Sequence, residues 1–252
     1  MTAPVFLVEP GRLDAVAPGD VVRLDGAEGR HAGVVQRRTA GERVDVVDTC
    51  GVRLVGVVAS VTHEGVDVQA QDVVREPAPP VRLVLVQALA KGDRDELAIE
   101  AATEVGADAV VPWQAERSIV VWRGERAAKS RARWLGTVRT AAKQSRRAWV
   151  PDVAHALDSR HLAARTREVV EAGGAVLVLH EDATEPLAGT ALPDAGDVLV
   201  VVGPEGGIGD DELARLTDAG ARPVRLGPHV LRTSTAGPVA LALLATRLGR
   251  WS

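Results

Sequence analysis

Among its 252 residues the sequence has one cysteine, one methionine, one phenylalanine and no tyrosine. The single cysteine, Cys50, excludes an internal disulfide bond and any metal cluster held by several cysteines. We interpret Cys50 as a structural residue in a turn. Because the sequence makes no use of disulfides, we expect the protein to work in the cytoplasm.

The sequence also has no apolar run that could cross a bilayer, since the longest, Val239–Ala245, falls far short of the roughly 20 residues needed. The N-terminus does not show the basic-then-apolar pattern of a secretory signal. The phosphate-binding patterns GxGxxG and GxxxxGK[ST] are missing. His180 has no second histidine at ligand spacing, so we expect no metal. A ligand should therefore be held by backbone edges.

Positive charge is in deficit overall, with a formal net charge of −4, but it is concentrated in one segment. Residues 116–150 carry ten basic side chains and two acidic ones, Glu116 and Glu125. A basic stripe on an acidic body can attract a polyanion. We therefore expect this segment to contact RNA, with Trp134 and Trp149 placed to stack on unpaired bases. The alternative is a solvated helix surface.

The stretch from Val198 to Leu248 organises the rest of the chain. Its short β-branched runs predict strands buried on both faces, and its glycine-rich segments predict loops. Two such loops leave the ends of two strands in one sheet, where open α/β sheets bind ligands. The expected elements are a strand Val198–Val202, a loop Gly203–Gly207, a helix capped by Asp210 and ended by Gly220, a strand Pro223–Leu226, a loop Gly227–Gly237 and a helix Pro238–Leu248.

The earlier residues divide at the proline-rich linker 76–80. Residues 1–75 show short β-rich runs typical of a small barrel, whereas residues 81–252 alternate strand and helix patterns that predict a parallel sheet. The first part should contain strands Val21–Leu24, Val44–Asp48, Arg53–Val61 and Val66–Gln69. The second should begin with strand Val81–Ala88, a helix from Asp93 to Gly106, strand Ala109–Val111, helix Glu125–Arg147, a helix capped by Ser159 and running to Glu171, and strand Ala175–Leu179.

The last predicted helix is apolar on nearly every face, and such a helix must be buried all round. We therefore expect it to pack against a second subunit in a two-fold homodimer. The alternative is a monomer whose last helix lies under its own sheet.

The segments GPEGG at 203–207 and LGPHVLRTSTA at 226–236 resemble the paired C-terminal motifs of the 16S ribosomal RNA uracil-N3 methyltransferase family of the SPOUT superfamily. The similarity continues through QALAKGDRDELAIEAATEVGADAVVPWQAERS at 87–118 and AAKQSRRAWVP at 141–151, and weakly through GRHAGVVQRR at 29–38. It covers essentially the whole chain.

The resemblance implies an α/β fold: a C-terminal SPOUT-type parallel sheet with a deep trefoil knot, preceded by a small N-terminal PUA-like β-barrel that binds RNA. It implies a homodimer that uses S-adenosyl-L-methionine to methylate N3 of a uridine in 16S ribosomal RNA of the small ribosomal subunit. Two alternatives remain: a related SPOUT enzyme acting on a ribose 2′-hydroxyl or a tRNA base, or a non-catalytic RNA-binding assembly factor.

The resemblance also implies the residues of the site, which three loops should form around the cofactor. The expected cofactor-binding residues are Leu179, His180, Glu181, Gly203, Pro204, Glu205, Gly207, Ile208, Leu226, Gly227, Val230, Leu231, Thr233, Thr235 and Ala236. The expected RNA contacts are Arg30, His31, Arg37, Arg38, Arg117, Ser118, Lys143, Arg146 and Arg147.

Two side chains are expected to act in catalysis. Arg232 should stabilise negative charge on the uracil oxygens, because an arginine offers fixed donors that stay charged. Glu205 should balance the sulfonium charge of the methyl donor or orient the substrate. Alternatively, Arg232 pairs with Glu205, or Glu205 accepts backbone N–H bonds at its own turn, and these contacts only shape the loops.

Two positions depart from the family pattern. The family usually has an acidic residue where this sequence has Ser234, and often arginine where it has His229. No catalytic base can therefore be assigned to Ser234, and we expect the N3 proton to leave to solvent while Arg232 stabilises the anion.

Overall fold

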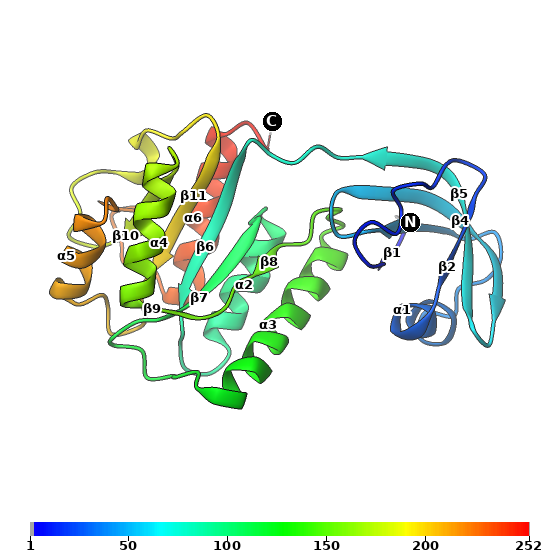
Figure 1. Cartoon of the computed structure of the whole chain (residues 1–252), viewed down its shortest axis with the longest axis horizontal. Helices are drawn as coiled ribbons and strands as arrows, with labels where there is room; N and C mark the ends of the chain where they lie inside the picture. The colour runs from blue at the N-terminus through cyan, green and yellow to red at the C-terminus, as the bar shows by residue number, and fades with distance from the viewer. Residues whose placement is uncertain (1–2, 252) are drawn as a thin grey trace. The chain divides into compact units, whose positions relative to one another are not determined.

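The computed structural model describes residues 3–251, which form two compact units (Figure 1). The N-terminal unit consists of residues 3–78 together with 142–150. The C-terminal unit consists of residues 79–141 and 151–251. The first division falls in the predicted linker.

The N-terminal unit is built on a five-stranded sheet in the order β1-β3-β4-β5-β2. The short strand β1 (Val5–Leu7) is parallel to β3 (Arg43–Val47), and the other neighbours are antiparallel. The remaining elements are β2 (Val21–Leu24), helix α1 (Gly26–Arg30), the π-helical turn His31–Val35, β4 (Val52–Thr62) and β5 (Gly65–Arg75). The four predicted strands are confirmed, whereas β1 and the helical segment had no clear sequence signal.

Residues 142–150 pack on the N-terminal unit although they lie far along the chain. Ala148 is buried in a cluster with Val5, Leu7 and Val47. Hydrogen bonds from Val150 N to Thr49 O (3.0 Å) and from Gly51 N to Ala148 O (3.2 Å) fix the segment. The basic segment therefore ends inside the N-terminal unit, which the position of the linker could not indicate.

The C-terminal unit has a parallel sheet in the order β12-β10-β11-β6-β7-β8, with β9 also paired to β7. This order places β10 between β11 and the edge strand β12, so the carboxyl ends of these three strands are neighbours. The strands are β6 (Val81–Ala88), β7 (Ala109–Gln114), β8 (Asp152–Val153), β9 (Leu157–Asp158), β10 (Ala175–Leu179), β11 (Gly196–Val202) and β12 (Arg222–Val224).

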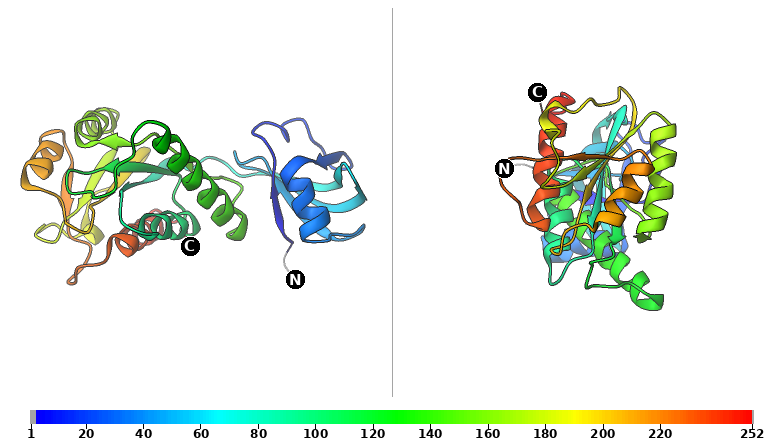
Figure 2. Two further views of the ribbon diagram at one scale, coloured as in Figure 1. Left: turned by 90° about the horizontal axis from the view of Figure 1, so that it is seen from below. Right: turned by 90° about the vertical axis from the view of Figure 1, so that its left-hand side faces the viewer.

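Helices cover both faces of this sheet (Figure 2). Helices α2 (Arg94–Glu104) and α6 (Thr233–Arg247) lie on one face, and α4 (Ser159–Glu171) and α5 (Asp210–Asp218) lie on the other. Most of the long helix α3 (Gly124–Gln144) and a 3-10 turn (Leu187–Gly189) complete the unit, and residues 142–144 of α3 belong to the N-terminal unit. No helix among residues 3–251 is long and apolar enough to span a membrane.

Side chains of β6 alternate between the two helical layers, as the pleat of a strand requires. Val84 and Val86 belong to the core that includes α4 and α5. Leu85 faces α6 so closely that a Cβ on Gly237 would lie 2.7 Å from its Cδ1. Gln87, two residues further on, is fully buried on this same side.

The last helix begins at Thr233, five residues before the predicted start at Pro238, and contains that proline. Proline is best tolerated in the first turn of a helix, which was the basis of the prediction. The structure starts the helix earlier because the Thr233 hydroxyl is anchored by hydrogen bonds to Gln87 and Gly203. Such long-range contacts leave no local sequence signal.

Two predicted helix caps were wrong by one residue. Helix α4 is capped by Asp158, which accepts from His161 N at 2.8 Å, and Ser159 is its first residue. Helix α5 is capped by Gly209 without a side-chain bond, and Asp210 is its first residue. Ser159 is instead buried, and its hydroxyl donates to Glu212. This tertiary contact occupies the side chain that local capping rules favoured as the helix cap.

Asp95, in the first turn of α2, is 2% exposed, and this burial raises the pKa of its carboxyl from 3.8 to about 6 despite hydrogen bonds from Glu96 N and Ala90 N. The folded state therefore binds this proton more tightly than the unfolded chain does. Relative to Asp95→Asn, the wild type should gain up to about 3 kcal/mol in unfolding free energy as the pH falls from about 6 to 4. Urea unfolding at several pH values measures this.

The control is Asp93→Asn, which changes an exposed carboxyl at the cap of the same helix. Parallel pH profiles for wild type and Asp95→Asn would contradict the assignment.

Candidate functional site

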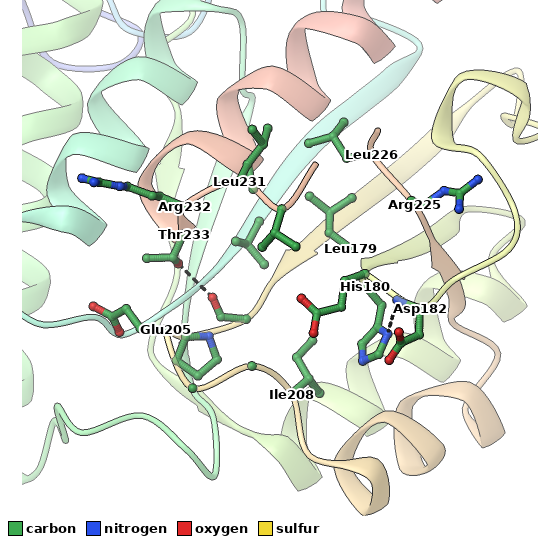
Figure 3. A pocket seen from close by; sticks show the side chains of 18 of the residues that line it. Leu179, His180, Asp182, Glu205, Ile208, Arg225, Leu226, Leu231, Arg232 and Thr233 are labelled. Atoms are coloured by element: carbon green, nitrogen blue, oxygen red, sulfur yellow. Dashed lines mark hydrogen bonds between the residues drawn. The ribbon is translucent and has the colours of Figure 1, made fainter. Parts of the chain in front are cut away.

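An open cavity of about 890 Å³ lies in the C-terminal unit at the carboxyl ends of β10, β11 and β12 (Figure 3). Its walls come from the three segments that follow these strands, 179–182, 202–208 and 225–233. Asp210, Ala236, Arg94 and Arg117 complete the lining. The strand order of the sheet thus brings together loops that are about 25 and 45 residues apart in the chain.

Every predicted cofactor residue lines this cavity except Thr235. Thr235 lies in the first turn of α6, where its N–H bonds to Arg232 O at 2.9 Å and its side chain is exposed. Its placement follows from the early start of α6. That the lining residues bind a cofactor remains a prediction.

The cavity has an apolar part and a part made of bare backbone. Leu179, Leu226, Leu231 and Ile208 supply large apolar side chains (Figure 3). Gly227 also lines the cavity, and nothing lies within 4 Å of the place where its Cβ would stand, so a ligand can approach its backbone closely. A flat apolar group and a chain of polar groups could therefore both be held here.

Glu205 carries the negative charge of the loop after β11, and its partner is Arg94. Its Oε1 accepts from Arg94 Nη1 at 2.7 Å and from Lys91 N at 3.3 Å. Burial acts to raise the pKa of Glu205, but hydrogen bonds from its own backbone N–H, from Arg94 and from Lys91 hold it below its ordinary value. Glu205 is therefore a carboxylate at neutral pH.

Arg232 lines the cavity with an exposed side chain, and its guanidinium makes no hydrogen bond or ion pair with other residues in the range 3–251. The alternative in which Arg232 pairs with Glu205 is wrong, because Arg94 takes that place. Arg232 is the N-cap residue of α6, with an extended backbone at φ −66° and ψ 151°. A charged donor is thus held at the cavity without a partner inside the described structure.

The residue after Arg232 ties two walls of the cavity together. Thr233 Oγ1 donates to Gly203 O at 2.8 Å (Figure 3) and accepts from Gln87 Nε2 at 2.9 Å. The start of α6 is thereby fixed to the end of β11 and to the end of β6.

Arg117 lies against the loop 206–209, where its Nη1 donates to Gly206 O at 3.0 Å. The turn that carries it is held by the buried carboxylate of Glu212, which accepts from Glu116 N at 2.9 Å. The predicted RNA contact Ser118 has a buried hydroxyl that makes no hydrogen bond with the described residues. Arg117 therefore reaches the cavity, whereas Ser118 faces the protein.

The predicted RNA residues of the N-terminal unit lie in two places. Arg30 and His31 belong to the α1 segment, followed by Arg37 with a left-handed φ of 52° and Arg38, which forms an ion pair with Glu42 at 3.7 Å. Lys143, Arg146 and Arg147 lie on the returning segment 142–150.

Lys143 is already paired, because its ammonium lies 2.8 Å from Glu28 Oε2 and over the Phe6 ring at 5.5 Å. It therefore offers less free charge to a polyanion than the sequence suggested. Arg146 takes a left-handed backbone with φ 59°, and its carbonyl accepts from Arg53 Nη2 at 2.7 Å. The guanidinium of Arg146 itself makes no hydrogen bond to the described residues, so its charge is available to a polyanion.

The prediction that Trp134 stacks on RNA bases was wrong. Its side chain is fully buried and packs edge-on against Trp122, with ring centroids 5.2 Å apart. Trp149 is half-buried and donates from Nε1 to Glu76 O at 3.1 Å. Helical periodicity placed Trp134 among basic residues, but the large ring was the side chain that the core required.

Arg94 and Arg225 line the cavity but were not predicted. Arg94 follows the capping-like Asp93, so the sequence pattern was interpreted only as a helix start. The position of Arg94 could have been predicted because it follows the loop after strand Val81–Ala88, and loops at the carboxyl ends of parallel strands form binding sites.

The family model for an RNA methyltransferase domain matches residues 77–245. The chain is 51% identical over 235 residues to the ribosomal RNA small subunit methyltransferase E of Mycobacterium bovis, covering 92% of this chain and 89% of that protein. It is 30% identical over 230 residues to the protein of the same name from Bacillus subtilis, covering 88% of each.

Among solved structures, the ribosomal RNA small subunit methyltransferase E from Neisseria gonorrhoeae, bound to S-adenosyl methionine, superposes with a TM-score of 0.85. The sequences are 27% identical, and the match covers 98% of both chains. Both units of the present fold therefore recur in that protein.

Replacing Arg94 with alanine should raise the pKa of Glu205, because the substitution removes a charged hydrogen-bond donor from the carboxylate. A carbon-detected NMR titration of the glutamate carboxyl groups measures the shift. Arg117→Ala is the matched control, since Arg117 bonds a carbonyl of the same loop instead. An equal titration in Arg94→Ala and wild type would show that the ion pair does not form in solution.

Proposed function

The chain belongs to the family of ribosomal RNA small subunit methyltransferases E, and from this premise we propose that it transfers a methyl group from S-adenosyl-L-methionine to N3 of a uridine in 16S ribosomal RNA. The observation that carries the proposal is the cavity at the ends of β10, β11 and β12, which combines apolar walls, the carboxylate of Glu205 and the guanidinium of Arg232, which has no partner in the described part of the chain.

The side chains and backbone groups that line this cavity fit S-adenosyl-L-methionine. Leu179, Leu226 and Leu231 offer apolar surface for an adenine ring, and the polar edge of the ring could approach the backbone at Gly227 closely. Glu205 supplies one negative charge near a sulfonium. When bound, the cofactor supplies an electrophilic methyl group.

Arg232 prepares the nucleophile. N3 of uracil is a poor nucleophile while it carries its proton, so the site must favour the anion. The guanidinium of Arg232 can donate to the uracil oxygens, on which the negative charge of the anion is spread. Because Arg232 makes no bond to the described residues, it loses no internal partner when substrate arrives.

The proton goes to solvent in this proposal. Ser234 lies in the first turn of α6 and does not line the cavity, so it does not replace a carboxylate there. Glu205 is a weak base because its pKa is lowered, and its Oε1 is already bonded to Arg94. Glu205 therefore acts through its charge, and the cavity is open enough for water to accept the proton.

We also propose that the C-terminal unit contains the deep trefoil knot of SPOUT proteins. Strand β12 pairs with β10 at the sheet edge, whereas α6 packs on β6 and β11. Residues 225–232 must therefore cross the ends of β10 and β11 to reach the start of α6. A threaded segment would hold its backbone groups in place before the cofactor binds, which lowers the ordering cost.

The N-terminal unit is proposed to be a PUA-like barrel that binds ribosomal RNA through Arg30, His31, Arg37, Arg38 and the segment 142–150.

A homodimer is proposed across the face formed by α2 and α6, where Leu97 and Val239 are 54% and 42% exposed. Two neighbouring helices that leave such side chains uncovered suit a second copy of the chain. The cytoplasm, where ribosomal subunits are assembled, is the proposed location.

An Arg232→Ala variant should bind S-adenosyl-L-methionine normally but lose roughly 100-fold or more in kcat, the scale expected for a lost anion-stabilising donor. Methyl transfer to isolated small ribosomal subunits that lack the modification measures this. Arg167→Ala on α4 removes an exposed arginine elsewhere and should not affect the rate. Normal turnover of Arg232→Ala would remove Arg232 from the mechanism.

The identity of the methylated nucleoside tests the function itself. Nuclease digestion and mass spectrometry of the product should give 3-methyluridine. A 2′-O-methylated nucleoside, or activity on tRNA alone, would support the related SPOUT activities instead. Calorimetry showing no heat with S-adenosyl-L-methionine would support the non-catalytic factor.

Arg146→Ala should weaken RNA binding. The negative slope of log affinity against log salt concentration should become less steep by about one unit, for the one phosphate contact that is lost. Filter binding at several salt concentrations gives the slope. Arg167→Ala, with the same change in net charge, should leave it unaltered. If both variants behave alike, Arg146 is only part of a solvated surface.

A further inference from the structure

We infer that Gln87 is a positioning residue for methyl transfer, which acts through Thr233 to hold Arg232 at the cavity. The inference rests on the proposed role of Arg232 and extends it to a residue that does not line the cavity itself. Gln87 sits one residue before the end of β6, the strand next to β11, and its side chain is fully buried.

The hydrogen bonds around Gln87 fix the direction of its amide. Gln87 Nε2 donates to Thr233 Oγ1 at 2.9 Å and to Ala88 O at 3.2 Å. Thr233 Oγ1 must donate its only proton to Gly203 O at 2.8 Å, because that carbonyl can only accept. The hydroxyl therefore needs a donor on its other side, which the amide nitrogen supplies. A flipped amide would place its oxygen against two acceptors.

The buried Gln87 side chain leaves one polar atom unsatisfied, which lowers the stability of the fold. Gln87 Oε1 is buried and has no hydrogen-bond partner among residues 3–251. An unsatisfied buried acceptor destabilises a fold, and an apolar side chain of similar length would avoid it. The amide therefore leaves one polar atom without a bond, and the bonds that it does make hold the Thr233 hydroxyl and Ala88 O.

The link from Thr233 to Arg232 is short. Arg232 directly precedes Thr233, and its carbonyl accepts from Thr235 N and Ala236 N at 2.9 Å each. Since its guanidinium has no bond to the described residues, the backbone at 232–233 determines where the side chain starts. A displacement of about 1 Å at a reacting centre can cost about 100-fold in rate. Gln87 thus fixes the backbone position from which the Arg232 side chain starts, through a direct hydrogen bond from β6 to α6.

The test compares Gln87→Met, Thr233→Val and the double variant. In Gln87→Met we expect kcat to fall roughly 10-fold or more, within the range that misplacement of a reacting group produces. The dissociation constant for S-adenosyl-L-methionine should change less than about threefold, since Gln87 does not line the cavity. The melting temperature should change little, because the substitution removes the unsatisfied oxygen together with two hydrogen bonds.

Two readouts separate positioning from general structural damage. The pH at which kcat reaches half its maximum should move upward in Gln87→Met, because a misplaced Arg232 stabilises the uracil anion less. The double variant should lose no more activity than Thr233→Val alone, since both substitutions break one chain of bonds. Thr166→Val is the matched control for Thr233→Val: Thr166 is also buried and donates to Leu162 O at 2.9 Å, and it does not line the cavity.

Wild-type kcat and pH profile in Gln87→Met would overturn the inference, and so would a loss of cofactor affinity as large as the loss of rate. Additive losses in the double variant would also overturn it. The proposed function is tested separately by Arg232→Ala. If that variant is inactive while Gln87→Met is unaffected, only the positioning role fails. If Arg232→Ala turns over normally, the role of Arg232 fails first.

Discussion

The close packing of α6 against β6 is the constraint on which the site depends. Gly237 lets the helix approach until only a glycine fits beside Leu85. With α6 held on the middle of the sheet and β12 at its edge, the connecting residues must run across the ends of β10 and β11. The cavity is the space that this crossing encloses, so its existence follows from how the last helix packs rather than from any loop by itself.

The two charged side chains of the cavity that are proposed to act in catalysis differ in whether they have a partner in the protein. Glu205 is held by Arg94 and a backbone N–H, so it is a fixed negative charge. Arg232 has no such partner among residues 3–251, so its guanidinium is available to an anion. A pair between Glu205 and Arg232 would have screened the guanidinium of Arg232 from an incoming anion, whereas pairing of Glu205 with Arg94 avoids this.

The sequence predicted most of this architecture, and the failures have a common cause. The buried strands β6, β10 and β11 were evident from apolar β-branched runs, and the glycine-rich loops after β11 and β12 were evident from composition. The start of α6, the role of Ser159 and the burial of Trp134 were not, because each depends on a partner far away in the chain. Arg94 shows the same limit at the site: its value comes from facing Glu205, more than 100 residues later. Local patterns specify elements, whereas these side chains are assigned by tertiary contacts.

The return of residues 142–150 to the N-terminal unit bears on how the protein is synthesised. Ala148 fills a cluster with Val5, Leu7 and Val47, and Lys143 neutralises Glu28, so the first 78 residues lack part of their own core. During translation this unit cannot reach its final packing until residue 150 has left the exit tunnel, by which time β6 and β7 of the second unit have already been made. The N-terminal unit is therefore completed only after the first strands of the second unit have been made, although each unit has a separate sheet.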